Sequence, residues 1–313
     1  MPMYDPGKIM EDAVAHNYAV AAFNIGNLES LQAVLWAAEK ENAPIFVQVL
    51  DITEKYVRDV DTYLKAVRAF LDKCAVPVVL HHDHCSCVEQ AIEAVDRGYK
   101  SVMFDGSALE FEENLEKTAR VVEYAHRNGV WVEAELGSIP SFGDTSFSNS
   151  AVKTDAELAA KFIKLSGCDS LAVAVGTAHG GVAGSGYLEF DFQRLEALRK
   201  KCPDYPFVLH GAASMPHAIL EYVNLQGGRV EEMHICSERD VALACKSGIH
   251  KANMDVDNWL VFTGAVRQYL RENPEVYYPL AFLEKGRDAW ENEARHKIRN
   301  IAGSSGMAGH FGL

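Results

Sequence analysis

Short apolar runs alternate with stretches of helical periodicity along the whole chain. The apolar runs are strand-sized and nearly continuous, which is typical of parallel strands covered on both faces. The predicted strands are Val20–Asn24, Pro44–Val49, Val76–His81, Ser101–Phe104, Val130–Glu135, Ser170–Val175, Pro206–His210 and Lys251–Met254. The helices predicted to follow them are, in the same order, Leu28–Glu41, Tyr63–Cys74, Val88–Arg97, Phe111–Asn128, Asp155–Leu165, Asp191–Lys200, Pro216–Tyr222 and Trp259–Arg271.

This repeated strand–helix order predicts an α/β protein, a (β/α)8 TIM barrel, with an extra C-terminal helix over Ala281–Asn300. A doubly wound open sheet is the alternative architecture. No linker or low-complexity stretch divides the chain, so residues 1–313 are predicted to form one barrel domain. Gly303–Gly309 is predicted to be a flexible tail.

Two irregular segments interrupt the pattern. Gly137–Thr154 follows the fifth predicted strand, and Gln226–Asp240 precedes the eighth. Long loops in compact domains are usually functional. We expect a functional loop at the first segment, because it leaves the carboxyl end of a strand. For the second we favour a tolerated surface insertion.

Composition excludes several classes of protein. Hydrophobic residues make up 48% of the chain and charged residues 24%, as in ordinary globular proteins, and no apolar run is long enough to span a membrane. The net charge of −14 argues against nucleic-acid binding. The start of the chain shows no secretory signal, and seven cysteines in no regular framework fit a reduced, cytoplasmic protein. Cys85 and Cys87 lack a second close pair, which argues against a four-cysteine zinc site.

Polar residues stand at the carboxyl ends of almost all the predicted strands, where barrel active sites form. Three histidines from three strands with an open fourth position are typical of a catalytic zinc site. The candidates are His84, His179 and His210, while His81 and His82 compete with His84 because strand parity does not decide which histidine faces inward.

Acidic residues and glycines accompany these histidines. Asp83 is the candidate general acid or base, or alternatively a group that orients a ligand. Asp105 and Glu135 could orient ligands or hold a second cation, monovalent or divalent; otherwise Asp105 would cap a helix and Glu135 would join a buried ion pair. Glycines let backbone N–H groups approach an anion. The predicted substrate contacts are Asn24, Gly180, Gly181, Gly211, Ser214, Asn253 and Asp255.

Several motifs, taken together, resemble the class II, metal-dependent ketose-bisphosphate aldolases, which include the fructose- and tagatose-bisphosphate enzymes. The resemblance runs from about residue 5 to 308. Its motifs are Val-Ala-Ala-Phe-Asn at 20–24, His-His-Asp-His at 81–84, Ser-Val-Met-Phe-Asp-Gly-Ser at 101–107, Val-Glu-Ala-Glu-Leu-Gly at 132–137, Leu-Ala-Val-Ala-Val-Gly-Thr-Ala-His-Gly at 171–180, Val-Leu-His-Gly at 208–211 and Thr-Gly-Ala-Val-Arg at 263–267.

The resemblance implies a barrel lyase of carbohydrate metabolism, such as glycolysis, that forms homodimers or homotetramers. It makes His84, His179 and His210 the ligands of one catalytic Zn²⁺ and Asp83 the residue that protonates the aldehyde oxygen. The implied reaction is a reversible retro-aldol cleavage of a ketose (bis)phosphate into dihydroxyacetone phosphate, or a related ketone, and an aldehyde. Zinc would stabilise the enediolate, near which Asn253 would hold the substrate. Asp105 and Glu135 would hold a second or resting metal position.

The sequence departs from the family pattern where phosphates are held. Ala213 replaces an expected serine, Val256 a threonine and Trp259 an arginine, and the lysine common after the second zinc histidine is absent. The loop after the fifth strand carries only Asp144 where the family has adjacent acidic residues. A bisphosphate aldolase that holds phosphate by backbone amides remains one interpretation, and a family member whose substrate lacks one or both phosphates is another. A non-catalytic or regulatory relative is a third interpretation, and a zinc hydrolase is a fourth.

Overall fold

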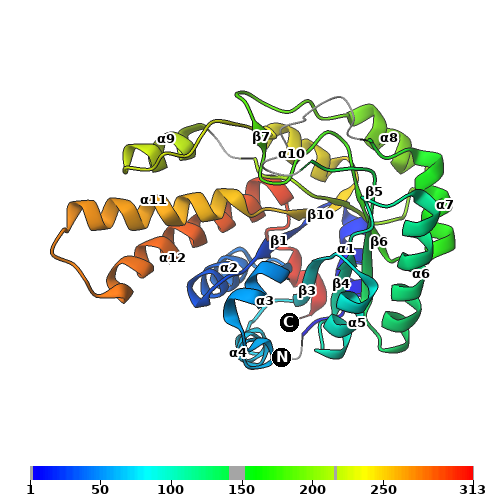
Figure 1. Cartoon of the computed structure of the whole chain (residues 1–313), viewed down its shortest axis with the longest axis horizontal. Helices are drawn as coiled ribbons and strands as arrows, with labels where there is room; N and C mark the ends of the chain where they lie inside the picture. The colour runs from blue at the N-terminus through cyan, green and yellow to red at the C-terminus, as the bar shows by residue number, and fades with distance from the viewer. Residues whose placement is uncertain (1–2, 141–151, 215–216, 313) are drawn as a thin grey trace.

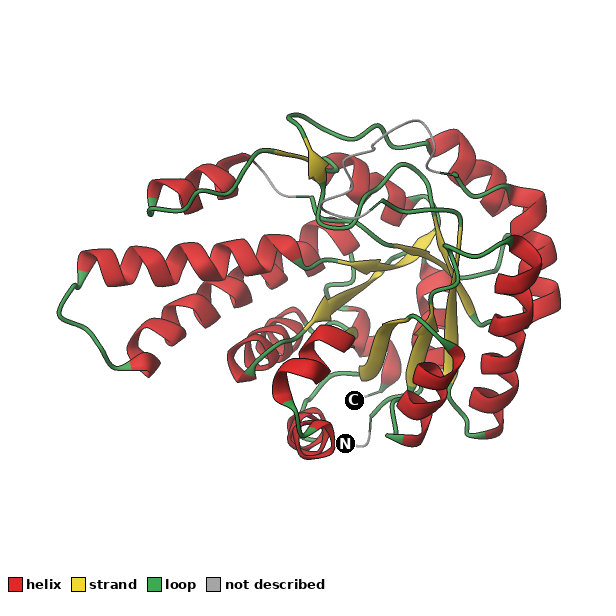
Figure 2. Cartoon of the chain, in the orientation of Figure 1, coloured by secondary structure: helices red, strands yellow, loops and turns green. Residues whose placement is uncertain are grey.

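The barrel is closed by parallel strands. The computed structural model describes residues 3–140, 152–214 and 217–312. In these residues the strands hydrogen-bond in the closed order β1-β10-β8-β6-β5-β4-β3-β2, around which the helices are arranged (Figures 1 and 2). The barrel strands are β1 (Val20–Asn24), β2 (Ile45–Leu50), β3 (Val78–Cys85), β4 (Ser101–Phe104), β5 (Trp131–Leu136), β6 (Ser170–Val173), β8 (Phe207–Leu209) and β10 (Ile249–Asn253). The predicted (β/α)8 barrel is therefore confirmed, and the open sheet is not.

Helices follow the strands as the sequence pattern predicts, with several additions. They are α1 (Pro6–His16), α2 (Leu28–Glu41), α3 (Asp51–Val57), α4 (Val60–Leu71), α5 (Val88–Asp96), α6 (Phe111–Arg127), α7 (Ala156–Ser166), α8 (Phe192–Lys201), α9 (His217–Leu225), α10 (Glu238–Lys246), α11 (Val256–Glu272) and α12 (Pro279–His296). Helices α11 and α12 lie side by side and project from the barrel (Figure 1). No described helix is long and apolar enough to cross a membrane.

Local sequence explains where α2 begins and ends. The Asn27 side chain accepts the Ser30 N–H at 2.9 Å, and the Ser30 hydroxyl accepts the Asn27 N–H at 3.1 Å. This reciprocal capping satisfies donors that the first helical turn leaves free. Asn42 ends the helix in the left-handed conformation, which asparagine tolerates better than most residues. The loop from β1 is therefore fixed beside the carboxyl end of the barrel.

Three features of the fold were missed by the sequence pattern. Helix α1 precedes the first strand, and its signal was present, because Asp5 caps the helix and Pro6 occupies its first turn. Helix α3 follows β2 directly. The segment 226–240, for which a surface insertion was favoured, contains β9 (Met233–His234) and the first turn of α10. Strand β9 pairs antiparallel with β7 (Val182–Ala183), outside the barrel.

The chain end is ordered, so the prediction of a flexible tail over 303–309 was wrong. A π-helical segment, η1 (Lys297–Ala302), continues α12, and a 3-10 helix, η2 (Met307–Phe311), follows. The Gly306 N–H donates to the Glu41 carbonyl at 2.8 Å, and the Ala308 N–H to the Asn42 carbonyl at 2.9 Å. The end of the chain is thereby fixed against the C-terminus of α2.

Candidate metal centre and active site

An irregularity in β3 directs His84 into the barrel mouth. His82 pairs with Val102 and Cys85 pairs with Phe104, so β3 carries one residue more than β4 over this stretch. His84 has a φ of 55°, in the left-handed region that non-glycine residues rarely adopt. Such a bulge breaks the strict alternation of side chains. Asp83 and His84 can therefore both line the same cavity, although they are adjacent.

The competing histidines have other partners. The His81 ring lies 2.7 Å from the Ser101 hydroxyl, and His82 Nδ1 lies 3.2 Å from the Cys85 sulfur. Both side chains are buried. Burial lowers the pKa of His82 to about 4 and also lowers that of His81. We interpret both as structural imidazoles, with His84 facing the site.

Three histidines and a glutamate converge at the mouth of the barrel. His84 Nε2 and His210 Nδ1 lie 3.0 Å apart, and the His179 ring centre is 4.8 Å from that of His84. Candidate ligand atoms of His84, Glu135, His179 and His210 all lie within 4.8 Å of one another. A tetrahedral zinc with Zn–N bonds of about 2.0–2.1 Å separates its ligand atoms by roughly 3.3 Å. The cluster is thus close to the spacing that a metal ion requires.

The donor chemistry also fits a cation. The buried Glu135 Oε2 has no hydrogen-bond partner among the described residues, which is unusual for a buried carboxylate. Burial lowers the pKa of His179 to about 3, so that ring is in the neutral form that binds metals. Burial opposes charge on His84 as well, but Asp83 and a 2.9 Å contact with Asp105 raise its pKa to about 10. The same carboxylates would stabilise a bound cation.

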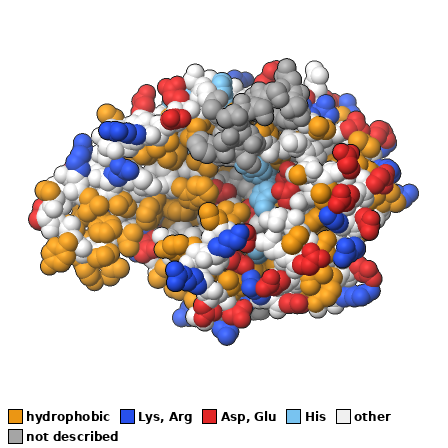
Figure 3. Space-filling model, in the orientation of Figure 1, with side chains coloured by type: hydrophobic (Ala, Val, Ile, Leu, Met, Phe, Trp, Pro, Cys, Tyr) orange, Lys and Arg blue, Asp and Glu red, His pale blue; other side chains and the backbone are white. Residues whose placement is uncertain are grey.

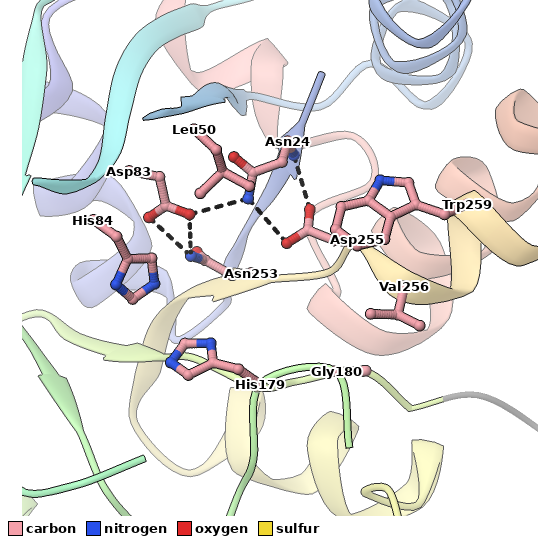
Figure 4. Close-up of a pocket in the computed structure, with 12 residues that line it drawn as sticks. Asn24, Leu50, Asp83, His84, His179, Gly180, Asn253, Asp255, Val256 and Trp259 are labelled. Atoms are coloured by element: carbon pink, nitrogen blue, oxygen red, sulfur yellow. Dashed lines mark hydrogen bonds between the residues drawn. The ribbon is translucent and has the colours of Figure 1, made fainter. Parts of the chain in front are cut away.

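Asp83 lies at the centre of a hydrogen-bond network beside the histidines (Figure 4). Its Oδ2 accepts from Asn24 Nδ2 at 3.0 Å, and Asn253 Nδ2 lies 3.3 Å from its Oδ1. Asp255 holds Asn24 in place through the backbone N–H at 2.8 Å and the side-chain amide at 3.0 Å. Burial raises the pKa of Asp255 to about 6, whereas that of Asp83 is well below its usual range because His84 and other nearby cationic groups outweigh burial. Asp83 is therefore ionised and positioned.

Glu133 and Lys251 lie behind the histidines, and the sequence pattern assigned neither of them a function. Glu133 Oε1 lies 2.8 Å from His210 Nε2, and Lys251 Nζ lies 3.0 Å from Glu133 Oε2. All three side chains are buried. A signal was present: Lys251 and Asn253 alternate on β10, as Glu133 and Glu135 do on β5, so each pair shares a face. An inward lysine requires a buried carboxylate partner, because an unpaired buried charge is costly.

The glycines predicted to contact substrate have different surroundings. Gly180 and Gly211 line the cavity, whereas Gly181 is not among its lining residues. A Cβ on Gly211 would meet the Ala178 carbonyl carbon at 2.5 Å, so only glycine allows this loop to approach the loop that carries His179. Ser214 is buried, and its hydroxyl receives a hydrogen bond from Lys297 Nζ at 3.1 Å. It is not among the cavity-lining residues either.

The cavity contains the positions where this sequence departs from the family pattern. It has a volume of about 300 Å³, and Ala213, Val256 and Trp259 line it together with Leu50. Figure 4 shows His84 and His179 at one side and Val256 and Trp259 at the other. No lysine or arginine lines the cavity among the described residues. Asp144 and most of the predicted loop 137–154 lie outside those residues.

Comparisons with known proteins agree with the fold. The family described as class-II fructose-bisphosphate aldolase matches residues 5–307. A fructose-bisphosphate aldolase of Thermus caldophilus is 37% identical, with 96% of this chain and 98% of the relative covered. One from Geobacillus stearothermophilus is 34% identical, with 98% and 99% covered. The crystal structure of the YdjI aldolase of Escherichia coli K12 superposes with a TM-score of 0.75 at 29% identity, covering 98% of this chain and 99% of that one.

These matches establish the class of protein. The fold is a (β/α)8 barrel with a histidine-rich mouth, and the matched region covers nearly the whole chain. The chain belongs to the class II fructose-bisphosphate aldolase family and is an aldolase, a carbon–carbon lyase. That family is metal dependent and acts on sugar phosphates, and the described residues include a group able to hold a metal ion.

Proposed function

We propose that the protein catalyses reversible retro-aldol cleavage of a phosphorylated ketose with one Zn²⁺ per subunit. The observation that supports this most strongly is the convergence of His84, His179 and His210 beside the cavity that the ionised Asp83 lines. When bound, zinc would supply Lewis acidity at the ketone and neighbouring hydroxyl oxygens. Asp105 and Glu135 are proposed to hold a second or resting cation, since both lie beside the histidines.

The chain's own residues would orient the substrate and move the proton. Asp83 would take the proton from the hydroxyl that becomes the aldehyde in cleavage, and return it in synthesis. Asn24 and Asn253 fix its carboxylate, and both of their side-chain oxygens lack partners among the described residues, leaving acceptors for substrate hydroxyls. Lys251 does not offer a free amine for a Schiff base, because it is buried and paired with Glu133. The remaining proposed substrate contacts are Gly180, Gly211 and Asp255, which line the cavity, whereas Gly181 and Ser214 do not.

We further propose that the preferred substrate carries fewer phosphates than fructose 1,6-bisphosphate. Ala213, Val256 and Trp259 line the cavity, and none of them offers a cationic side chain to a phosphate. Backbone N–H groups near Gly180 and Gly211, which line the cavity, could still hold one phosphate. Burying a second phosphate against methyl groups would leave anionic oxygens without partners, which is costly.

A cleavage screen tests this proposal. Zinc-loaded enzyme is given phosphorylated and unphosphorylated ketoses, and the aldehyde and ketone products are quantified. Alanine variants of His84, His179 and His210 should lose both bound zinc and cleavage. Full zinc occupancy and activity in all three variants would contradict the metal assignment. Hydrolysis without aldol products would favour a hydrolase, and inactivity on every ketose would favour a regulatory relative.

We also propose a homodimer or homotetramer that works in the cytoplasm. Apolar side chains gather where α11 and α12 project (Figure 3), and Tyr277 there is 90% exposed. Such patches often mark interfaces. All seven cysteines are unpaired, as expected of a reducing compartment. Light scattering in solution gives the number of subunits, and fractionation of the source cells gives the compartment; a monomer or a secreted protein would contradict these proposals.

A further inference from the structure

A second hollow adjoins the metal cavity. It has a volume of about 410 Å³, and Trp259 lines both spaces. The second hollow, here called the outer crevice, lies between the start of α2, helix α3, and helices α11 and α12. Its lining residues are Gly26, Asn27, Ser30, Ile52, Thr53, Tyr56, Trp259 and Trp290. Ligand pockets usually measure roughly 300–1,000 Å³, so the metal cavity alone is at the lower limit of that range.

Trp259 lies between the two spaces and is the residue that their linings share. It lies in the first turn of α11, on the side of the metal cavity opposite His84 and His179 (Figure 4), and 42% of its surface is exposed. A substrate bound at the histidines and extended away from them therefore meets the indole first. Beyond the indole, it reaches the exposed side chains of Ile52 and Tyr56 on α3.

The outer crevice is built for an uncharged ligand. Among the described residues, neither lining contains a lysine or an arginine. The undescribed segments 141–151 and 215–216 contain no lysine or arginine in the sequence. The available polar groups are neutral: the Asn27 amide, the Thr53 oxygen, the Tyr56 hydroxyl and the indole N–H groups of Trp259 and Trp290, the latter without a hydrogen-bond partner among the described residues. Thr53 uses its hydroxyl hydrogen on the Ile25 carbonyl at 3.2 Å, which leaves its oxygen able to accept.

Aromatic faces with a few neutral hydrogen-bonding groups suit the C–H and hydroxyl groups of a sugar chain. A phosphate would need cationic partners or several converging donors, and without them its burial is unfavourable. We propose, resting on the function proposed above, that the aldehyde half of the substrate crosses the Trp259 indole into the outer crevice. That half ends as an uncharged polyhydroxylated chain, without a terminal phosphate.

Aldol synthesis with a matched pair of acceptors tests the idea. Zinc-loaded enzyme and dihydroxyacetone phosphate are combined with erythrose or with erythrose 4-phosphate, which differ only in the terminal phosphate. We expect kcat/KM to be at least about tenfold higher for erythrose, because the terminal phosphate would have to be buried without cationic partners. Equal or higher kcat/KM for erythrose 4-phosphate would overturn the proposal.

Variants of Trp259 test whether this residue sets the preference between acceptor aldehydes. Trp259→Ala should lower the ratio of kcat/KM for erythrose over glycolaldehyde by about tenfold, because the short acceptor does not reach the outer crevice. Trp259→Arg should shift preference towards erythrose 4-phosphate by at least about tenfold. Phe70→Ala, an exposed aromatic on α4 away from both spaces, should leave both ratios unchanged. Unchanged ratios in both Trp259 variants would contradict this role of Trp259.

A binding measurement separates this proposal from the reaction. Glucitol 1-phosphate and glucitol 1,6-bisphosphate lack a ketone and cannot be cleaved, so their affinities for zinc-loaded enzyme are measured by calorimetry. Tighter binding of the monophosphate than of the bisphosphate, with this preference lost in Trp259→Arg, would support the outer crevice. This result would hold even if the enzyme cleaves no ketose, and only the proposed reaction would then fail. Tighter binding of the bisphosphate, or no binding of either compound, overturns the proposal.

Discussion

Asp83 combines features that are seldom found together in one carboxylate. It is buried, yet its pKa stays well below the usual range because His84 and other nearby cationic groups outweigh burial. We predict that Asp83→Ala retains zinc but cleaves roughly 10²–10⁴-fold more slowly, the usual effect of removing a general acid or base. Metal analysis and single-turnover cleavage measure the two properties separately. Cleavage at the parent rate would leave Asp83 a structural neighbour of His84.

Glu133 is predicted to position His210. Its Oε1 lies 2.8 Å from His210 Nε2, which leaves Nδ1 facing the metal position. Carboxylates behind ligand histidines usually contribute a factor of about 10–100 in metal affinity. Glu133→Gln should therefore weaken zinc binding by that factor in a chelator competition, with the fold retained by circular dichroism. Glu123→Gln, on the exposed face of α6, is the matched control. Parent-like affinity in Glu133→Gln would remove this role.

For individual residues, the sequence predicted which residue types form the site but not which way their side chains point. The histidine, aspartate and asparagine candidates could be named because each ends a predicted strand. The choice among His81, His82 and His84 could not be made, since one extra residue in β3 reverses side-chain parity beyond it. The alternation on β5 and β10 places Glu133 and Lys251 on the inward faces, but their pairing with each other depends on how the two strands face across the barrel interior, which the sequence pattern does not give.

Among the elements, the π-helical segment η1 reaches the loop after β8 through one buried side chain. Lys297 Nζ lies 2.7 Å from Asp257 Oδ2 and donates to the Ser214 carbonyl at 3.2 Å. Burial opposes its charge, but Asp257 and Glu293 raise its pKa above the usual value. Lys297 thereby ties the C-terminal segment to two loops: residues 253–257, which join β10 to α11, and residues 211–214, which follow β8.

Removing this lysine should destabilise the barrel. Lys297→Met leaves Asp257, which is fully buried, without its counter-charge, and such losses cost about 3–5 kcal/mol. Urea unfolding should show this loss, whereas Lys200→Met on α8, 75% exposed, should change stability by less than about 0.5 kcal/mol. An equal response in the two variants would show that Lys297 contributes no more to stability than an exposed lysine does.

Element positions were predictable because the strands are buried on both faces and are therefore apolar over nearly their whole length. Helices α3 and α10 were missed because the prediction assigned one helix after each strand, and these two helices are additional to that alternation. Helix α3 begins directly after β2 with no side-chain cap. The small β7–β9 sheet is too short to produce a periodic signal.

At the scale of the whole molecule, the C-terminal segment packs against α2 near the start of the barrel. Arg295, Arg299 and Ser305 all bind the carboxylate of Glu41 at the C-terminus of α2, with the Arg295 Nε contact at 2.9 Å. The C-terminal segment is therefore joined to α2 by a buried charge that no local pattern reveals. We propose that residues 1–313 unfold as one cooperative domain. Coincident fluorescence and circular dichroism transitions would support this, and two separate transitions would contradict it.

The Glu41 cluster also gives a pH dependence of stability. Burial opposes ionisation, but hydrogen bonds from Arg299 and Arg295 lower the pKa of Glu41 below its usual 4.5. A carboxyl whose pKa is lowered on folding stabilises the protein fully above about pH 4.5, and this contribution is lost as the pH falls through the folded pKa. Glu41→Gln should therefore lower the free energy of unfolding by roughly 1–3 kcal/mol near pH 7, the scale of hydrogen bonds to charged groups.

The difference in free energy of unfolding between this variant and the parent should shrink steadily below pH 4.5. Glu196→Gln, an exposed carboxyl paired within α8, should show little difference at either pH. Urea unfolding from pH 7 to pH 3 measures both variants, and a difference for Glu41→Gln that stays constant with pH would show that the charge of Glu41 does not hold the chain end.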